Sequence, residues 1–410
     1  MFRSILYSCL LAVAGAAQSE PLTLESALAL ARRQAPDVAL QAASVDAAEA
    51  AATAAGRLPD PKLTLGIDNL PVDGVDRWSL TRDSMTMQKV GLMQDVPNGG
   101  KRRAEADIAR AVVARARAEQ RVRLLEIQRD TALAWLARYY VERRGTLLDG
   151  LQRENELLQS AVEAQLAGGR ALPADALLPR QEAAEIADRR DELAGAITRS
   201  KAVLRRWIGA AADEPLAGDP PALPIDADHL RAHVHEHPEL AVFVPMTQLA
   251  QAEVHAAEAM KRPDWGVELA YGRRGAAFGD MVSLQFTVGL PLFARTRQEP
   301  AIESRRQALN RVEAERDAML RDHTTDLEAD LVEYDTVSRQ LARMQELRLP
   351  LARQKVDYQF ASYRGGKGDL GAVLGARREL IELELRELEL QGQRAAVAAR
   401  LHFIYGEGAQ

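Results

Sequence analysis

An internal duplication limits what this chain of 410 residues can fold into more than any other feature of its sequence. Ala35-Pro36-Asp37-Val38 recurs as His237-Pro238-Glu239-Leu240, and Gly168-Gly169 recurs as Gly365-Gly366. Glycine and proline mark where helices and strands end, so their repetition indicates matching elements and not only a shared composition. The sequence therefore predicts two copies of one structural unit.

Each repeat is predicted to contain an opening helix, two strands and a helical hairpin, in that order. In the first repeat, residues 18–215, these elements lie at about 22–56, 62–69, 86–94 and 100–209. A linker at 216–225 leads to the second repeat, residues 226–410, with elements at about 226–260, 265–271, 281–290 and 298–406. The first arm of each helical hairpin has about 65 residues, which predicts a rod of about 100 Å.

Composition favours helices and excludes several functions. Charged residues make up 27% of the chain and aromatic residues only 5%, as is typical of long helices. The net charge of −6 gives no reason to expect a nucleic-acid partner. No phosphate-binding loop, zinc-protease motif or catalytic triad is recognisable, so we expect neither enzymatic activity nor a cofactor.

The N-terminus has the layout of a secretory signal peptide, predicted at residues 1–17. Met1-Phe2-Arg3 is positively charged, residues 4–14 are almost wholly apolar, and small residues follow. The only cysteine, Cys9, lies inside the apolar run and not just after it. We therefore predict no lipid anchor, and no disulfide or thiolate metal site in the mature chain.

The stretch 281–290 shows the clearest strand pattern. One face carries the apolar side chains Val282, Leu284, Phe286, Val288 and Leu290, and polar or small residues alternate with them. This length and alternation match an outer-membrane strand, with the apolar side chains facing lipid. The alternative is an edge strand of a soluble sheet, but two isolated hairpins are barely stable.

Two repeats of a β-hairpin followed by a very long helical hairpin resemble the TolC family of bacterial outer-membrane efflux channels. The resemblance covers essentially the whole mature chain. It implies a mainly α protein with membrane β-hairpins, in which three protomers form a 12-stranded β-barrel continued by a periplasmic α-helical barrel. Four strands cannot close alone, and an open sheet edge is not viable in lipid, so the chain must oligomerise if its hairpins lie in the membrane. The resemblance implies a homotrimer in the outer membrane of a Gram-negative bacterium.

Two strand-to-helix junctions resemble the CzcC-like members of that family. Val96-Pro97-Asn98-Gly99-Gly100-Lys101-Arg102 is similar to their Pro-Gly-Lys-Arg motif, and Leu290-Pro291-Leu292-Phe293 to their Pro-Leu-Phe segment. The resemblance implies export of heavy-metal cations with a periplasmic adaptor and an inner-membrane RND pump. From the residues alone, Pro97 and Pro291 end strands, Gly99 and Gly100 free the turn, and Lys101 and Arg102 lie near the membrane edge.

The glycine pairs are predicted to form the periplasmic tips of the hairpins, which set the aperture and dock the adaptor. The tip residues are Gly168, Gly169, Arg170, Arg364, Gly365, Gly366, Lys367 and Asp369. In TolC-like channels, acidic pairs beyond the second tip bind cations, but here Ala372 and Gly375 stand at those positions. A tip that selects cations and a basic tip that docks an acidic adaptor surface are equally consistent.

The sequence contains two groups of candidate metal ligands, one of histidines and one of methionines, and each group is also explained by packing or solvation. His233 and His237 share a face if they lie on one helix, with Glu236 nearby, and are the best candidate ligands. We favour a solvated helix start before Pro238 and predict no metal site. Met85, Met87 and Met93 suggest a soft copper or silver site, but packing is favoured.

Two rival functions remain open from the sequence. The first is a soluble periplasmic coiled-coil scaffold or adaptor, which would expose the apolar face of 281–290 to water. The second is a TolC-family channel for drugs or for type I secretion.

Overall fold

The computed structural model describes residues 21–169 and 172–406. The predicted signal peptide 1–17, with Cys9, and the tip residue Arg170 lie outside the described residues. The chain divides into two compact units, and each unit combines segments of both repeats. The described segments of unit one are 21–35, 127–223 and 336–399, and those of unit two are 36–126, 224–335 and 400–406.

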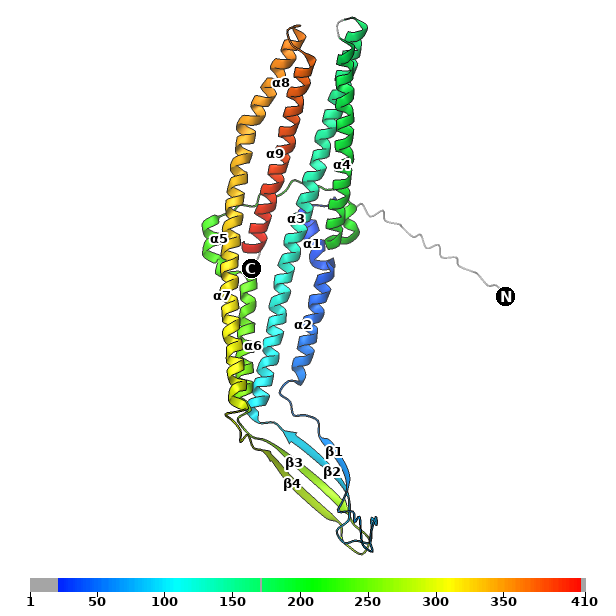
Figure 1. Ribbon diagram of the computed structural model, residues 1–410, viewed down its shortest axis with the longest axis vertical. Helices are drawn as coiled ribbons and strands as arrows, with labels where there is room; N and C mark the ends of the chain where they lie inside the picture. The colour runs from blue at the N-terminus through cyan, green and yellow to red at the C-terminus, as the bar shows by residue number, and fades with distance from the viewer. Residues whose placement is uncertain (1–20, 170–171, 407–410) are drawn as a thin grey trace, which may run out of the picture. The chain divides into compact units, whose positions relative to one another are not determined.

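Unit one consists mainly of two helical hairpins (Figure 1). The first joins the later part of α3 (Gly99–Ala167) to α4 (Leu177–Ile208), and the second joins α8 (Leu349–Arg364) to most of α9 (Leu370–Tyr405). Leu148 of α3, Ile186 of α4 and Ile381 of α9 share one apolar cluster, so the two hairpins pack against each other. The unit also holds α1 (Leu24–Gln34), the end of α7, a π-helical turn at Met344–Arg348 and short 3-10 helices at Pro173–Ala176 and Gly209–Asp213.

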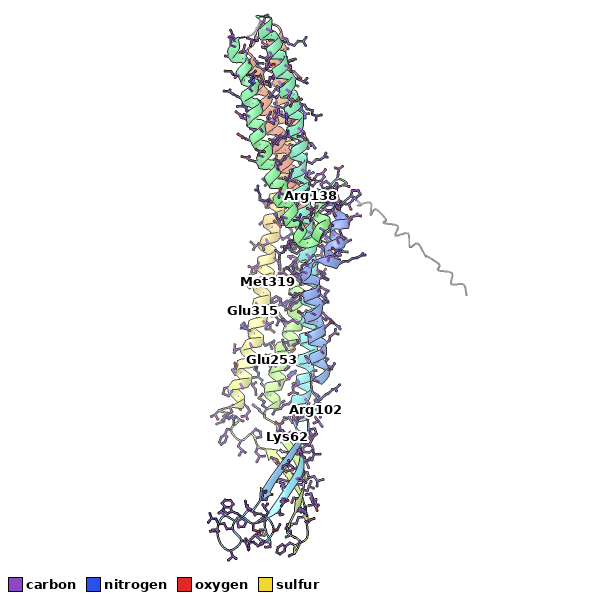
Figure 2. The ribbon with its side chains drawn as sticks, turned by 90° about the vertical axis from the view of Figure 1, so that its right-hand side faces the viewer. Lys62, Arg102, Arg138, Glu253, Glu315 and Met319 are labelled. Atoms are coloured by element: carbon purple, nitrogen blue, oxygen red, sulfur yellow. The ribbon has the colours of Figure 1, made fainter. Side chains whose placement is uncertain are left out.

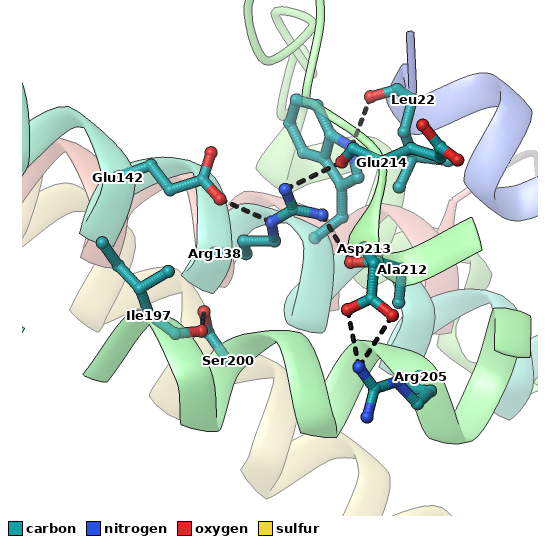
Figure 3. A network of polar contacts seen from close by, with 10 residues as sticks. Leu22, Arg138, Glu142, Ile197, Ser200, Arg205, Ala212, Asp213 and Glu214 are labelled. Atoms are coloured by element: carbon teal, nitrogen blue, oxygen red, sulfur yellow. Dashed lines mark hydrogen bonds and ion pairs between the residues drawn. The ribbon is translucent and has the colours of Figure 1, made fainter. Parts of the chain in front are cut away.

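A buried arginine holds the end of the first repeat in place (Figure 3). Arg138 of α3 is 1% exposed and donates to the carbonyl oxygens of Ala212 and Glu214, over 2.7 and 2.8 Å. Its Nε also donates to the Glu142 carboxylate over 2.7 Å. A buried guanidinium is tolerated only when its charge and donors are satisfied, so these contacts fix where the chain leaves the first repeat.

Unit two places a four-stranded antiparallel sheet at one end of a group of helices (Figure 1). The strands β1 (Lys62–Asp68), β2 (Met87–Val96), β3 (Asp264–Arg273) and β4 (Met281–Gly289) lie in sequence order. The helices are α2 (Pro36–Ala54), the first part of α3, α5 (Ala227–His233), α6 (Pro238–Ala259), most of α7 (Gln298–Arg343) and the end of α9. Phe243 of α6 and Val312 of α7 are buried in one cluster, which Met319 also contacts (Figure 2). Among the described residues, no helix is both long and apolar enough to cross a membrane.

The opening helix of each repeat is broken, which corrects the prediction of continuous helices at 22–56 and 226–260. The breaks fall at Ala35 and His237, whose ψ angles of 131° and 133° are extended. Both residues precede a proline, and the proline ring disfavours helical geometry at the residue before it. Each repeat therefore begins with a short helix followed by a longer one.

The remaining boundaries agree closely with the predicted ones. Gly169 and Gly366 end the first arms of the hairpins with φ angles of +66° and +68°, which side chains rarely adopt. β2 extends two residues further than predicted, to Val96, and β4 ends one residue earlier, at Gly289. Leu290, predicted as a strand residue, is exposed just beyond the end of β4.

Candidate functional site

The sheet has one apolar face that is exposed across all four strands. The register pairs Leu65 with Val90, Val90 with Tyr271, and Tyr271 with Val282, so these side chains point to the same side. The exposed apolar side chains of this face are Leu63, Leu65, Ile67, Val90, Leu92, Trp265, Leu269, Tyr271, Val282, Leu284, Phe286 and Val288. A patch of this extent is too large for an ordinary water-facing surface and indicates contact with an apolar environment.

The opposite face of the sheet is polar and internally paired. Glu268 of β3 accepts a hydrogen bond from Thr64 Oγ1 over 2.9 Å, and its carboxylate lies 3.1 Å from Lys89 Nζ. Lys62 Nζ, labelled in Figure 2, lies 2.6 Å from the Asp95 carboxylate. The sheet therefore separates an apolar side from a charged, hydrogen-bonded side.

The junction between β2 and α3 is held by two side chains that the sequence analysis did not single out. The Asn98 side-chain amide donates to Ala259 O over 3.1 Å and to Asp264 Oδ1 over 2.9 Å, and Asn98 Oδ1 accepts the Lys101 N–H over 3.0 Å. Asn98 thus caps α3 and fastens it to the start of β3.

Lys101 and Arg102 have partners within the protein, which alters the predicted role of these basic residues. Lys101 forms an ion pair with Asp264, and Arg102 Nε donates to Gly56 O over 2.9 Å. Figure 2 shows Arg102 at the end of α3 next to the sheet. Both residues fasten the helix to the neighbouring chain.

Glycine has a steric role at only one of the two predicted turn positions of this junction. A Cβ at Gly100 would lie 3.1 Å from that of Ala259, whereas one at Gly99 would meet nothing within 4 Å. Pro291 follows β4, and a short turn-rich segment leads from it to α7.

The hairpin tips in unit one carry exposed charge. Arg364, Lys367 and Asp369 are exposed, as are the described glycines Gly168, Gly169, Gly365 and Gly366. Arg364 lies over the ring of Phe360 at 5.9 Å, and Asp369 accepts the Gly371 N–H over 3.1 Å at the start of α9. Ala372 and Gly375 are exposed on α9, so these two positions next to the second tip carry no acidic side chain.

Ion pairs connect the two hairpins along their length. Arg378 of α9 contacts Glu182 and Glu185 of α4 at 2.8 and 3.2 Å, and the hydrogen bond to Glu182 raises the pKa of Arg378. Nearer the tips, Tyr363 Oη donates to Gln165 Oε1 over 2.7 Å. These contacts oppose any separation of the tips.

The candidate metal ligands His233 and His237 do not lie on one helix. His233 ends α5 and its Nδ1 lies 2.8 Å from His229 O, whereas His237 is the N-cap of α6. The intervening 3-10 turn at Val234–Glu236 removes the predicted i, i+4 relation. His237 instead lies beside His323 of α7.

Comparison with known proteins shows similarity to outer membrane efflux proteins. Residues 233–407 match the family described as outer membrane efflux protein. The chain is also 24% identical to the cobalt-zinc-cadmium resistance protein CzcC of Cupriavidus metallidurans over 402 residues, which cover 94% of this chain and 90% of CzcC.

Solved structures confirm the predicted TolC-like fold. The crystal structure of CusC matches with a TM-score of 0.79 at 14% identity, covering 93% of this chain and 92% of CusC. VceC of Vibrio cholerae matches with a TM-score of 0.75 at 19% identity, covering 93% and 96%. These matches show the fold of the chain.

Proposed function

We propose that three copies of this chain form the exit duct of a tripartite efflux pump for heavy-metal cations. The observation that carries the channel is the two-sided sheet, whose apolar face suits lipid and whose polar face suits a water-filled lumen. β1 and β4 are the outer strands of the described sheet. Edge-to-edge pairing of three sheets satisfies these strands in lipid, where unpaired backbone groups are costly.

The helical hairpins of this channel extend into the periplasm and meet the adaptor at their tips. The exposed charges of Arg364, Lys367 and Asp369 support a docking surface, which threefold symmetry presents three times. Because Ala372 and Gly375 leave the start of α9 without acidic side chains, we favour adaptor docking over cation selection at the tips. Export by a signal peptide at 1–17 without a lipid anchor belongs to the same proposal.

Opening of the duct requires the tips to move apart while transport remains passive. Arg378 with Glu182 and Glu185, and Tyr363 with Gln165, are the contacts that must rearrange. An inner-membrane RND pump supplies the energy, and the adaptor supplies the differential contacts that favour the open arrangement.

The similarity to CzcC over nearly the whole chain supports heavy-metal cations as cargo. Cobalt, zinc and cadmium are named for that relative, and copper or silver is the alternative metal cargo. Deletion of the gene, with its pump expressed, should lower tolerance to at least one of these metals, and the wild-type gene should restore it. Unchanged metal tolerance with lowered drug tolerance would overturn the metal cargo but leave the channel intact.

A substitution on each face of β4 tests the membrane sheet directly. Leu284→Arg places a charge on the apolar face and is expected to cost about 2–4 kcal/mol if that face meets lipid near the bilayer centre. Gln285→Arg places the same charge on the neighbouring residue, whose side chain points to the opposite face of the sheet, and serves as the matched control. The readout is the yield of detergent-extracted trimer from the outer membrane.

Only the first variant should lose trimer. Equal yields for both variants, or recovery of the wild-type chain from the soluble periplasm, would overturn the membrane sheet and favour a soluble scaffold.

A further inference from the structure

A buried cluster of two histidines and one glutamate lies where α6 begins. His237 and His323 stack with ring centroids 3.8 Å apart, and their exposed fractions are 7% and 8%. Glu239 Oε2 lies 3.1 Å from His323 Nε2. One donor atom from each of the three side chains lies within 4.8 Å of the other two. All three residues belong to unit two.

The Nε2 atom of His323 is buried and has no hydrogen-bond partner. The Glu239 carboxylate is close enough, but the direction of the 3.1 Å contact does not make a hydrogen bond. Buried polar nitrogens are nearly always bonded, because they lose their water without compensation otherwise. This nitrogen therefore points to a partner that completes the cluster.

The ring of His237 already has one hydrogen-bond partner. Its Nδ1 accepts the Glu239 backbone N–H over 3.1 Å, and an ion bound at Nδ1 replaces this hydrogen bond.

We propose that His237, Glu239 and His323 bind a divalent transition-metal ion of the zinc class. Two imidazole nitrogens and one carboxylate oxygen form the ligand set of open zinc sites, in which water takes the fourth position. Donor atoms around zinc lie about 3.3 Å apart, because bonds to the ion are about 2.0–2.1 Å long. Small side-chain rotations bring ligands that start within 4.8 Å to these distances.

The donor set also selects among metals. Imidazole and carboxylate suit Zn²⁺, Co²⁺, Ni²⁺ and Cu²⁺, whereas Cu⁺ and Ag⁺ prefer sulfur, which this cluster lacks. Glu239 is partly exposed, so an ion reaches the buried histidines from the carboxylate side.

The bound ion joins α6 to α7 of unit two, and α9 packs beside the site. His237 is the first residue before α6, and His323 lies within α7. Tyr405, near the end of α9, donates to His323 O over 3.2 Å, and its ring centroid lies 5.4 Å from that of His237. The site holds α6 and α7 together, and this structural role does not depend on which cargo passes through the channel.

Metal titration of the full-length, detergent-extracted chain tests the site. After EDTA treatment and its removal at neutral pH, ZnCl₂ is titrated by calorimetry and CoCl₂ by visible absorption. We expect about one ion per chain, with a Kd of about 10 µM or tighter, and cobalt bands typical of four or five ligands. No saturable binding at this affinity would overturn the proposal.

Nearby surface histidines require a control. His229, His233 and His235 stack on one another and could capture metal by themselves. The triple variant H229A/H233A/H235A should keep binding of one ion per chain. Loss of binding in this triple variant would assign the metal to the surface and overturn the buried site.

Glu239→Gln and His323→Gln, each added to the triple variant, should weaken zinc binding at least tenfold. E239Q keeps the size of the side chain and the backbone N–H that His237 accepts, so it tests ligation without removing the cap. Circular dichroism and trimer yield show whether either variant folds. Wild-type affinity in a folded E239Q variant would overturn the proposal, while metal tolerance of the cell tests the cargo separately.

Discussion

The two repeats use different side chains at the same joint, by which we mean the break between the two opening helices, at Ala35 in repeat one and at His237 in repeat two. In repeat one, Arg123 of α3 donates to Asp37 at the start of α2 over 2.7 Å and also pairs with Glu126. In repeat two, the glutamate in the position of Asp37 faces His323 of α7, and His237 stacks on that histidine. The break before proline is shared, but one joint is closed by permanent charges and the other by imidazoles.

This difference shows that the duplicated fold does not need one particular contact at the joint. The Arg123 and Asp37 side chains are 27% and 28% exposed, so water screens their attraction. The His323 side chain is only 10% exposed. The second joint is thus drier, and it is the one whose stability we expect to depend on a bound ion.

The largest effect is expected from Arg138, which holds the end of repeat one in place. Arg138→Met leaves two carbonyl oxygens and the Glu142 carboxylate without this donor, and should destabilise unit one by about 3–5 kcal/mol. The measurement is the apparent melting temperature and protease resistance of the detergent-extracted protein.

Arg205→Met is the matched control, because Arg205 makes a bidentate but half-exposed ion pair with Asp213, at 2.6 and 2.7 Å (Figure 3). Such a pair contributes about 0.2–1 kcal/mol. Equal losses in the two variants would mean that burial does not distinguish these arginines.

The next effect concerns metal addition and removal, which should act on the second joint alone. At a zinc concentration of about 100 times the Kd, one site stabilises the folded chain by about 2.7 kcal/mol. Melting with zinc and again after EDTA measures this difference. E239Q should lose the zinc-dependent part, whereas Asp37→Asn should keep it. If zinc still raises the melting temperature of E239Q but no longer raises that of D37N, the metal site lies at the first joint and not at the second.

Much of this fold could be predicted because the repeated glycines and prolines act locally. The tips at Gly169 and Gly366, and the ends of the strands, follow from residues a few positions away. The breaks at Ala35 and His237 carried the same kind of signal, since each precedes a proline, but the helical composition on both sides outweighed it.

The site depended on contacts that no local pattern contains. His323 lies 86 positions after His237 in the sequence, within an ordinary stretch of polar helix, so nothing marked it as a partner. Asn98 and Asp264 meet across 166 positions for the same reason. Helix periodicity predicts which residues share a face, but it does not predict which residues of different helices meet.

A smaller effect is expected when the charge pair of the first joint is removed. Asp37→Asn keeps the shape of the side chain but loses its attraction to Arg123, which should cost about 1 kcal/mol or less. Because this joint is partly exposed, the difference in melting temperature between wild type and variant should shrink from about 0.05 to 1 M NaCl. Glu49→Gln, which removes a more exposed partner of Arg117, should cost less still. A loss in D37N that is independent of salt would contradict the view of this joint as a screened ion pair.

The smallest effect is expected at His233, the residue that the sequence paired with His237. His233→Ala removes one contact of Nδ1 with the His229 carbonyl at the end of α5, and alanine favours helix there, so stability should change by less than about 0.5 kcal/mol. Zinc affinity of the chain should stay within about twofold of wild type, because the 3-10 turn separates His233 from the buried cluster. Calorimetric titration of H233A beside H323Q makes the comparison within one repeat. If H233A loses zinc binding while H323Q keeps it, His233 and not His323 is the ligand, as the sequence pattern suggested. The second joint would then be a packed contact without a metal ion.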